Sequence, residues 1–359
     1  MKKIKVINQF TPNVAFGDSI SNALLYMQRL LYKMGFETKI YISADKVDIN
    51  FKNRVYHISE YKSDSEQLLL YHHSIGHNYH DEIMRFQDKK VLIYHNITPS
   101  HFFKKNEILR ELCKLGRIQL EKSSKYFSYS IADSKYNANE LLAYNYKKIK
   151  VLPVLIDFEK EEKVVTNEKL IKKYSSFYNF LFVGRIVPHK AQLHLIDVVY
   201  QLKQKGLKNF VFHIVGSVGD EEYMKTLKSY ALGLEVMEFI NFSGKVSNED
   251  LSAYYKLADL YLSLSEHEGF GMPLIEAMKQ DVLILAYNAG GISTTVPKVC
   301  LLDKKSASFV AKSIINLQNN PKDRVNMIKK QKEHLSKFAC SKVYKKFEKY
   351  IKEICENEF

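Results

Sequence analysis

Two glutamates, Glu268 and Glu276, lie in a short stretch that also carries glycine and proline. The apolar run at residues 260–264 predicts a buried strand before them, and the apolar run after Pro273 predicts a helix. Open α/β sheets bind ligands at the carboxyl ends of their strands, so we expect both carboxylates to project toward one pocket. The start of a helix at this point also offers backbone N–H groups to an anion.

The same carboxylates have a simpler interpretation. With Pro273 at the first helical position, Glu276 falls in the first turn and complements the helix dipole, which contributes about 0.3–1 kcal/mol. Glu268 is then only a solvated loop charge. Taken alone, this stretch does not decide between a ligand site and an ordinary helix start.

A second stretch has residues suited to binding an anion. Gly184 ends a strand predicted at residues 180–183, and Arg185 and Lys190 flank a proline-containing turn before the helix predicted at residues 193–202. A guanidinium binds phosphate through two hydrogen bonds and an ammonium acts as a point charge, so the pair suits a diphosphate. The alternative is two solvated cations in a chain that contains 54 lysines and arginines.

Together the two stretches resemble the motifs of a known enzyme family. The segment from Glu268 to Glu276 is similar to the E-x7-E signature of retaining nucleotide-sugar glycosyltransferases of family 4, which have the GT-B fold. The segment from Gly184 to Lys190 resembles the G-R-x-x-x-x-K element of that family. The resemblance implies that Arg185 and Lys190 hold the pyrophosphate of the donor, that Glu268 faces the donor sugar, and that Glu276 accepts hydrogen bonds from the ribose. It also implies that these groups neutralise the leaving diphosphate without a metal ion.

The resemblance extends to further donor-binding positions in the first β-α turn, after three later strands and between the two glutamates. They are Gly17, Gly184, Gly216, Lys245, Val246, Gly269, Phe270, Gly271, Met272, Pro273 and Leu274. Gly216 is also compatible with a plain turn after a strand. Ser247, just beyond Val246, predicts a helix N-cap, and that interpretation is compatible with a base-binding loop.

Histidines in the first half of the chain suggest two further hypotheses. His95, in Tyr-His-Asn-Ile-Thr-Pro, is similar to the catalytic histidine that many family members present to the donor sugar. A histidine after a strand is also often a structural residue with satisfied hydrogen bonds. His73 and His77 have the spacing of a zinc pair on a helix, but Gly76 makes that helix doubtful and no cysteine lies near. We therefore expect no metal site.

Alternating apolar runs and helical stretches predict the elements that position these residues. The predicted strands are residues 3–7, 39–42, 67–71, 90–94, 129–132 and 150–155, then 180–183, 211–215, 237–242, 259–264 and 282–286. A helix is predicted over residues 19–34. The pattern predicts an α/β protein with two doubly wound, Rossmann-like domains, and the GT-B resemblance implies that they face each other across a cleft. We expect an N-terminal acceptor domain at residues 1–165, a donor domain at 175–340, and a last helix at 341–359 that crosses back to the first domain.

Composition limits the remaining possibilities. The length of 359 residues favours two domains, and no apolar run is long enough to span a membrane. The basic start lacks the apolar core of a signal peptide, and four scattered cysteines predict neither a disulfide framework nor a zinc ribbon, so we expect a cytoplasmic protein. The formal charge of +14 favours an anionic partner, and without a nucleic-acid-binding motif we prefer peripheral contact with the anionic inner face of the cytoplasmic membrane.

The resemblance implies a metal-independent, retaining hexosyltransferase that needs no cofactor besides its nucleotide-sugar donor. The acceptor would be a glycan or a lipid-linked saccharide in the assembly of a bacterial surface polysaccharide, such as O-antigen, capsule or lipopolysaccharide. The segments His-His-Ser-Ile-Gly and His-Asn-Ile-Thr-Pro favour a mannose- or rhamnose-type sugar. The alternatives are an epimerase or phosphorylase of the same fold, or a non-catalytic basic binding subunit. The base, the acceptor, the linkage and the oligomeric state stay open.

Overall fold

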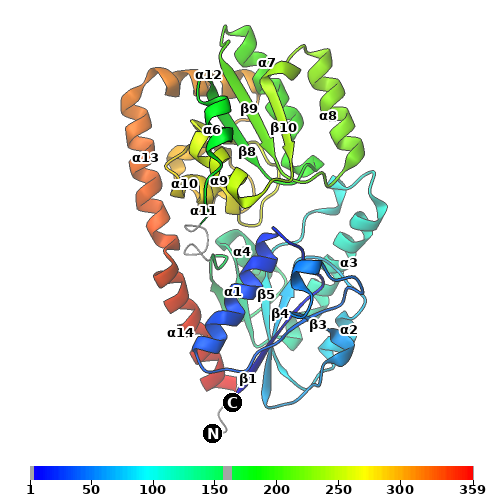
Figure 1. Ribbon diagram of the computed structural model, residues 1–359. Helices are drawn as coiled ribbons and strands as arrows, with labels where there is room; N and C mark the ends of the chain where they lie inside the picture. The colour runs from blue at the N-terminus through cyan, green and yellow to red at the C-terminus, as the bar shows by residue number, and fades with distance from the viewer. Residues whose placement is uncertain (1–3, 157–163, 359) are drawn as a thin grey trace. The chain divides into compact units, whose positions relative to one another are not determined.

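The computed structural model describes residues 4–156 and 164–358 of the chain. These residues form two compact units, one from residues 1–158 together with 338–359 and the other from residues 159–337. Each unit is built around one sheet with helices on its faces (Figure 1). Residues 157–163, near the end of the predicted N-terminal domain, and Lys3 of the first predicted strand lie outside the described residues.

The sheet of the first unit has seven strands, all parallel to their neighbours, in the order β3-β2-β1-β4-β5-β6-β7. They are β1 (Val6–Thr11), β2 (Ile40–Ile42), β3 (Tyr56–His57), β4 (Gln67–His73), β5 (Lys89–Tyr94), β6 (Tyr129–Ala132) and β7 (Ile149–Val151). The chain builds outward from β1 in one direction and then returns to build from β4 in the other. Loops at the carboxyl ends of β1 and β4 therefore diverge and leave a crevice.

Helices cover both faces of this sheet. One face packs against α1 (Ser19–Lys33) and α14 (Cys340–Glu358), and the other against α2 (His80–Met84), α3 (Glu107–Ser123) and α4 (Lys135–Ala143). Short 3-10 helices lie at Ile49–Phe51, Ile58–Glu60, Ser100–Phe102, Ser124–Tyr126 and Ser336–Phe338. One face of the last helix is apolar, and its residues Val343, Phe347, Ile351 and Ile354 are buried in the core of the first unit.

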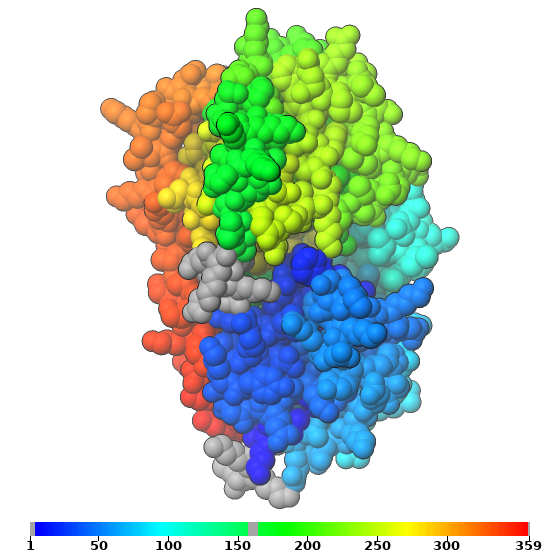
Figure 2. Space-filling view, in the orientation of Figure 1, coloured from blue at the N-terminus to red at the C-terminus, as the bar shows by residue number. Residues whose placement is uncertain are grey.

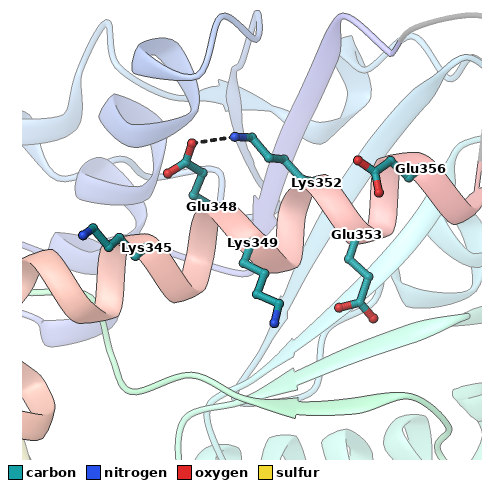
Figure 3. A pocket seen from close by; sticks show the side chains of 6 residues that line it. All are labelled: Lys345, Glu348, Lys349, Lys352, Glu353 and Glu356. Carbon is teal, nitrogen blue, oxygen red and sulfur yellow. Dashed lines mark hydrogen bonds and ion pairs between the residues drawn. The ribbon is translucent and has the colours of Figure 1, made fainter.

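The outward side of α14 is charged. Six of its residues line a pocket on the surface: Lys345, Glu348, Lys349, Lys352, Glu353 and Glu356 (Figure 3). Lys352 pairs with Glu348 at 2.8 Å, and Glu353 pairs with Lys150 of the sheet at 2.8 Å. Charges of both signs that neutralise one another in this way are typical of a solvated helix face.

The sheet of the second unit has six parallel strands in the order β10-β9-β8-β11-β12-β13. They are β8 (Tyr178–Val183), β9 (Phe210–Val215), β10 (Ile240–Gly244), β11 (Leu260–Ser263), β12 (Leu283–Tyr287) and β13 (Leu301–Leu302). Here the order reverses between β8 and β11. The loops that follow these two strands therefore frame the place where such a sheet binds ligands.

The helices of the second unit connect these strands. They are α6 (Glu168–Tyr174), α7 (Gln192–Gln204), α8 (Glu221–Gly233), α9 (Asn248–Leu257), α10 (Met272–Lys279), α11 (Ile292–Thr295), α12 (Ala307–Asn319) and α13 (Pro321–Leu335), with 3-10 helices at Pro188–Lys190, Met237–Phe239 and Lys298–Cys300. α7 packs against α8 and α12, α10 against α13, and α6 against α9. In Figure 2, α6 and the residues beside it, in green, stand out on the face of the second unit.

The predicted fold class is confirmed, because both units are doubly wound parallel sheets. Several predicted strand limits are wrong, and three of them stand out. β1 begins at Val6, β7 ends at Val151, and residues 237–239 form a 3-10 helix before β10. β3 and β13 were not predicted, since two-residue strands show no alternation of polar and apolar residues.

Within the described residues, no helix combines the length and apolar character needed to cross a membrane. The four cysteines are free thiols, and two of them, Cys113 and Cys300, are buried.

Buried histidines form a hydrogen-bonded cluster around Tyr71. Its hydroxyl lies 2.7 Å from Nε2 of His77 and 2.8 Å from Nδ1 of His80, while Nε2 of His73 donates to the Gly116 carbonyl oxygen at 2.9 Å. His77 precedes α2, so the pair proposed for zinc does not share a helix. Burial lowers the pKa of His73 to about 4 and that of His77 to about 3, so both rings are neutral in the folded protein at pH 7.

We expect these histidines to make the protein sensitive to acid. In the unfolded chain histidine takes up a proton near pH 6.5, while folded His77 resists protonation down to about pH 3. The stabilisation is thus fully present above pH 6.5 and is lost as the pH falls, by about 1.4 kcal/mol per pH unit for each such histidine. Urea denaturation at pH 7, 6 and 5 should show a shallower loss for His77→Gln than for the wild type. The matched control, His101→Gln at an exposed histidine, should keep the wild-type slope; equal slopes for all three proteins would contradict this account.

Candidate functional site

The side chains predicted to bind the donor diphosphate and sugar gather at the carboxyl edge of the second sheet. Arg185 lies two residues after β8, and Lys190 ends the 3-10 helix that follows. Glu268 lies in the loop after β11, and Glu276 lies on α10 beyond it. The structure therefore brings the four charged residues to the point where the strand order reverses.

The ends of three neighbouring strands are held together by glycine. Gly184 donates its N–H to the Val215 oxygen at 2.9 Å, and Gly216 donates its N–H to the Gly244 oxygen at 2.8 Å. A Cβ atom on Gly216 would lie 2.1 Å from the Gly184 oxygen, and the Gly216 φ of +148° also favours glycine. Gly216 thus has a packing role that explains it without a ligand. Lys245, which is exposed, directly follows Gly244 at the end of β10.

Lys190 and Glu268 form an ion pair. The distance from Lys190 Nζ to Glu268 Oε1 is 2.6 Å, and the two side chains are only 16% and 15% exposed. Arg185 is exposed, and none of the ion pairs within the described residues includes it. Its main chain is held in place, because Gln192 Nε2 donates to the Arg185 carbonyl oxygen at 2.9 Å. The edge therefore presents one neutralised cation and one that is ready to accept an anion.

The loop that carries Glu268 rests on two glycines that the sequence interpretation missed. Gly291 donates its N–H to the Glu268 carbonyl oxygen at 2.7 Å. A Cβ atom on Gly291 would lie 2.1 Å from the Gly269 oxygen, and one on Gly290 would lie 2.3 Å from the Glu268 oxygen. The adjacent Gly-Gly pair after a predicted strand was the available signal, because such pairs mark turns and close backbone approaches.

Glu276 lies in the second turn of α10, so its predicted place in the first turn is wrong. The helix begins at Met272, which makes Pro273 the second residue instead of the first. Tyr255 donates its hydroxyl to Glu276 Oε2 at 2.5 Å. Burial raises the pKa of Glu276, and the bond from Tyr255 and the charge of Lys279 oppose that rise.

The environment of Tyr261 indicates that Glu268 and Glu276 lie close to the same buried side chain. Its buried hydroxyl donates to the Val183 oxygen at 3.1 Å, at the end of β8. Burial raises the pKa of Tyr261 well above its usual range, and the charges of Glu268 and Glu276 raise it further. Both carboxylates therefore lie near the same phenol between β8 and β11.

The start of α10 offers fewer N–H groups to an anion than expected. Gly271 precedes it with a φ of +89°, a conformation that favours glycine. Pro273 has no N–H, and the N–H of Leu274 donates to the Gly271 oxygen at 3.0 Å. The side chains of Leu274 and Phe270 are buried. The part of the helix start that can face a ligand is thus the Gly271–Met272 peptide.

Further charged residues surround this edge. Glu266 binds Lys305 through an ion pair and lies 3.9 Å from Nε2 of His194. His189, next to Lys190, is buried, and this burial, with the charges of Lys190, His267 and Arg185, lowers its pKa to about 2. Lys305 is far from the motif in the sequence, and the sheet brings it to this edge from a separate loop. The result is an edge that can hold a polyanion beside a group rich in hydroxyls.

Two of the predicted site residues, Gly17 and His95, belong to the first unit. Gly17, with a φ of +80°, is exposed in the turn between β1 and α1. His95 follows β5 and its side chain is 4% exposed. Its Nδ1 lies 2.7 Å from Asp133 Oδ2 and its Nε2 lies 2.8 Å from Nδ1 of His72. Both ring nitrogens of His95 are therefore engaged within the protein.

Comparisons with known proteins agree with this geometry. Residues 165–334 match the model of the family described as glycosyl transferases group 1. The 2-deoxystreptamine glucosyltransferase of Streptomyces kanamyceticus is 34% identical over 118 residues, which cover 33% of this chain and 30% of that protein. A GDP-mannose-dependent alpha-(1-6)-phosphatidylinositol monomannoside mannosyltransferase of Mycobacterium tuberculosis is 27% identical over 145 residues, covering 38% of this chain and 37% of its own length.

These matches span less than half the length of either relative. The structural similarity extends further. HepE of Anabaena, solved in complex with UDP and glucose, aligns with a TM-score of 0.76 at 16% identity, over 97% of this chain and all of that one. This similarity establishes that the two-unit architecture, the GT-B fold that we predicted, is shared over nearly the whole chain.

The matched region contains both motifs, from Arg185 to Glu276, and the strands and glycines that hold them at one edge of the sheet. The match to the glycosyl transferases group 1 family extends over residues 165–334, just under half of the chain.

Proposed function

We propose that this protein is a retaining glycosyltransferase that moves a sugar from a nucleoside-diphosphate donor to a glycan or lipid-linked acceptor. The observation that carries the proposal is the Lys190–Glu268 pair, at 2.6 Å, beside the exposed Arg185 where the strand order reverses. Opposite charges placed there match the two halves of such a donor, one anionic and one rich in hydroxyls.

Each charged residue then has one role. Arg185 and Lys190 bind the diphosphate, and they stabilise the negative charge that develops as the sugar–phosphate bond breaks. Glu268 accepts hydrogen bonds from the sugar, and Glu276, oriented by Tyr255, accepts them from the ribose. The backbone at Lys245 and Val246 meets the base. This arrangement requires no metal ion to neutralise the leaving group.

The ion pair implies an exchange of partners when the donor binds. Without a ligand, Lys190 and Glu268 neutralise each other. The diphosphate replaces the Glu268 carboxylate as the partner of Lys190, and Glu268 becomes available to the sugar hydroxyls. A donor that carries both groups satisfies both residues, whereas a nucleoside diphosphate without sugar separates the pair and leaves Glu268 without its partner.

The finer assignments rest on similarity. HepE binds UDP and glucose and the mycobacterial relative uses GDP-mannose, so both nucleotides are candidates. We favour a mannose- or rhamnose-type sugar and an acceptor in the assembly of a bacterial surface polysaccharide. The formal charge of +14 supports peripheral contact with an anionic membrane that presents this acceptor.

Activity should depend on the charged edge. Purified protein is assayed for release of nucleoside diphosphate from UDP-, GDP-, dTDP- and ADP-sugars, with magnesium or with EDTA. Arg185→Ala and Glu268→Ala should each lower kcat/KM by about 100- to 1,000-fold, the cost of losing one stabilising group in a preorganised site. Lys208→Ala, at an exposed lysine near the opposite edge of the sheet, is the matched control and should retain wild-type activity. A strict need for magnesium, or inversion of the anomeric configuration in the product, would count against the mechanism.

The partner exchange predicts that one variant binds a ligand more tightly. Glu268→Gln removes the carboxylate that competes for Lys190, so it should bind a nucleoside diphosphate without sugar about two- to tenfold more tightly than the wild type. The same variant should lose activity with the complete donor. Calorimetric titration measures the affinity, and Glu238→Gln, at an exposed glutamate of the 3-10 helix before β10, serves as control. Unchanged or weaker binding by Glu268→Gln would show that the pair does not compete with the diphosphate.

A further inference from the structure

Three side chains form a hydrogen-bonded row at the carboxyl edge of the first sheet. His72 lies at the end of β4, and His95 and Asp133 directly follow β5 and β6. Nδ1 of His72 lies 2.8 Å from Nε2 of His95, and Nδ1 of His95 lies 2.7 Å from Oδ2 of Asp133. Because β4, β5 and β6 are consecutive neighbours in the sheet, the row follows the sheet edge.

With Asp133 ionised and His95 neutral, the direction of both hydrogen bonds is fixed. An ionised carboxylate only accepts, so His95 donates from Nδ1 to Asp133. In neutral His95 the other nitrogen, Nε2, is then an acceptor, and His72 must donate to it from Nδ1. Both rings are therefore Nδ1–H tautomers, and Nε2 of His72 carries a lone pair.

Burial makes this the stable arrangement. His72 is 1% exposed, and its ring lies nearly parallel to that of His95, with centroids 5.1 Å apart and planes 12° apart. Burial and the neighbouring His95 lower the pKa of His72 well below its usual range, which keeps the ring neutral. Nε2 of His72 has no hydrogen-bond partner within the described part of the chain. All the bonding that His72 contributes is thus directed at His95.

The main chain at His95 is fixed independently of the row. Asn96, with a φ of +73°, donates from Nδ2 to Asn137 Oδ1 at 3.0 Å and to Glu140 Oε2 at 2.9 Å. The His95 N–H donates to the His73 oxygen at 3.1 Å. The remaining freedom at His95 is rotation of its ring, and His72 and Asp133 remove that freedom from opposite sides.

We infer that His72 is a positioning residue that acts through His95, by donating from Nδ1 to hold the His95 ring in one tautomer and one orientation. The inference rests on the proposed function and on the family resemblance, which implies that His95 is the catalytic histidine. It gives a role to two residues, His72 and Asp133, to which the motif similarity assigns none. Its distinguishing feature is that the effect of His72 depends on the presence of His95.

The tautomers can be measured without any assay of activity. Protein labelled with nitrogen-15 at histidine is examined by long-range nitrogen–proton correlation spectra, with signals assigned from His72→Leu and His95→Gln. We expect His72 and His95 to be Nδ1–H tautomers, and the His95 signals to shift or broaden in His72→Leu. An Nε2–H tautomer at His95, or signals unchanged by His72→Leu, would overturn the inference even if the protein proved not to be a transferase.

A double-mutant cycle tests the role in turnover. His72→Leu should lower kcat by about 10- to 100-fold with little change in KM for the donor, because the site is misaligned rather than lost. His72→Asn keeps a donor at the position of Nδ1 and lacks Nε2, so it should retain most of the activity. In a His95→Ala background, adding His72→Leu should change kcat by less than about twofold, since coupled residues are not additive.

A control variant and a set of contradicting results make the experiment decisive. His73→Asn replaces a buried histidine on the opposite face of the same strand, and it should lower the unfolding midpoint without the loss of kcat seen for His72→Leu. An equal loss from His72→Leu in the wild-type and His95→Ala backgrounds, or a His72→Asn variant as poor as His72→Leu, would overturn the inference. Full activity of His95→Ala would instead remove His95 from the proposed site, and no turnover by the wild type with any donor would refute the proposed function.

Discussion

The loops after β8 and β11 hold their charged residues together because glycine allows the backbones to touch. Gly216 lies against the Gly184 oxygen, and Gly290 and Gly291 lie against the oxygens of Glu268 and Gly269. At each contact a Cβ atom would come within 2.3 Å of an oxygen, so a larger residue would force the loops apart. The position of the Lys190–Glu268 pair depends on this close packing, as does its position relative to Arg185.

The charge arrangement explains how a site for a highly charged ligand stays stable when empty. Lys190 is paired with Glu268 and Lys305 with Glu266, so most of the charge at this edge is balanced within the protein. Glu276 is held by Tyr255, which satisfies a carboxylate that burial would otherwise disfavour. Arg185 stays exposed, where water solvates it. Arg185, the cation without an ion-pair partner among the described residues, is thus the one whose charge water stabilises best. It is also the one that a diphosphate can reach first.

Much of this architecture follows from local sequence. Apolar periodicity predicted the longer strands of both sheets, and the N-cap at Ser247 followed from a short-range pattern. The motif spacing predicted which charged residues gather after β8 and β11. The start of α10 was misplaced by one residue, because proline suits either of the first helical positions and the spacing alone cannot choose between them.

Contacts between distant strands were beyond the sequence. His72 and Asp133 join His95 only because β4, β5 and β6 are neighbours in the sheet, and no pattern in one sequence reports that order. The pairing of Tyr255 with Glu276 likewise depends on packing between α9 and α10. Similarly, the ion pair of Lys190 with Glu268 was not foreseen, since the motif describes these residues by the ligand they bind and not by what they do without it.

The most direct measurement is a crystal structure of the protein with the nucleoside diphosphate that binds most tightly in the calorimetric panel. The account predicts the diphosphate at the end of β8, within hydrogen-bond distance of Arg185 and Lys190, with Lys190 no longer bonded to Glu268. A diphosphate bound elsewhere on the protein, or one bound while the Lys190–Glu268 pair stays intact, would contradict it.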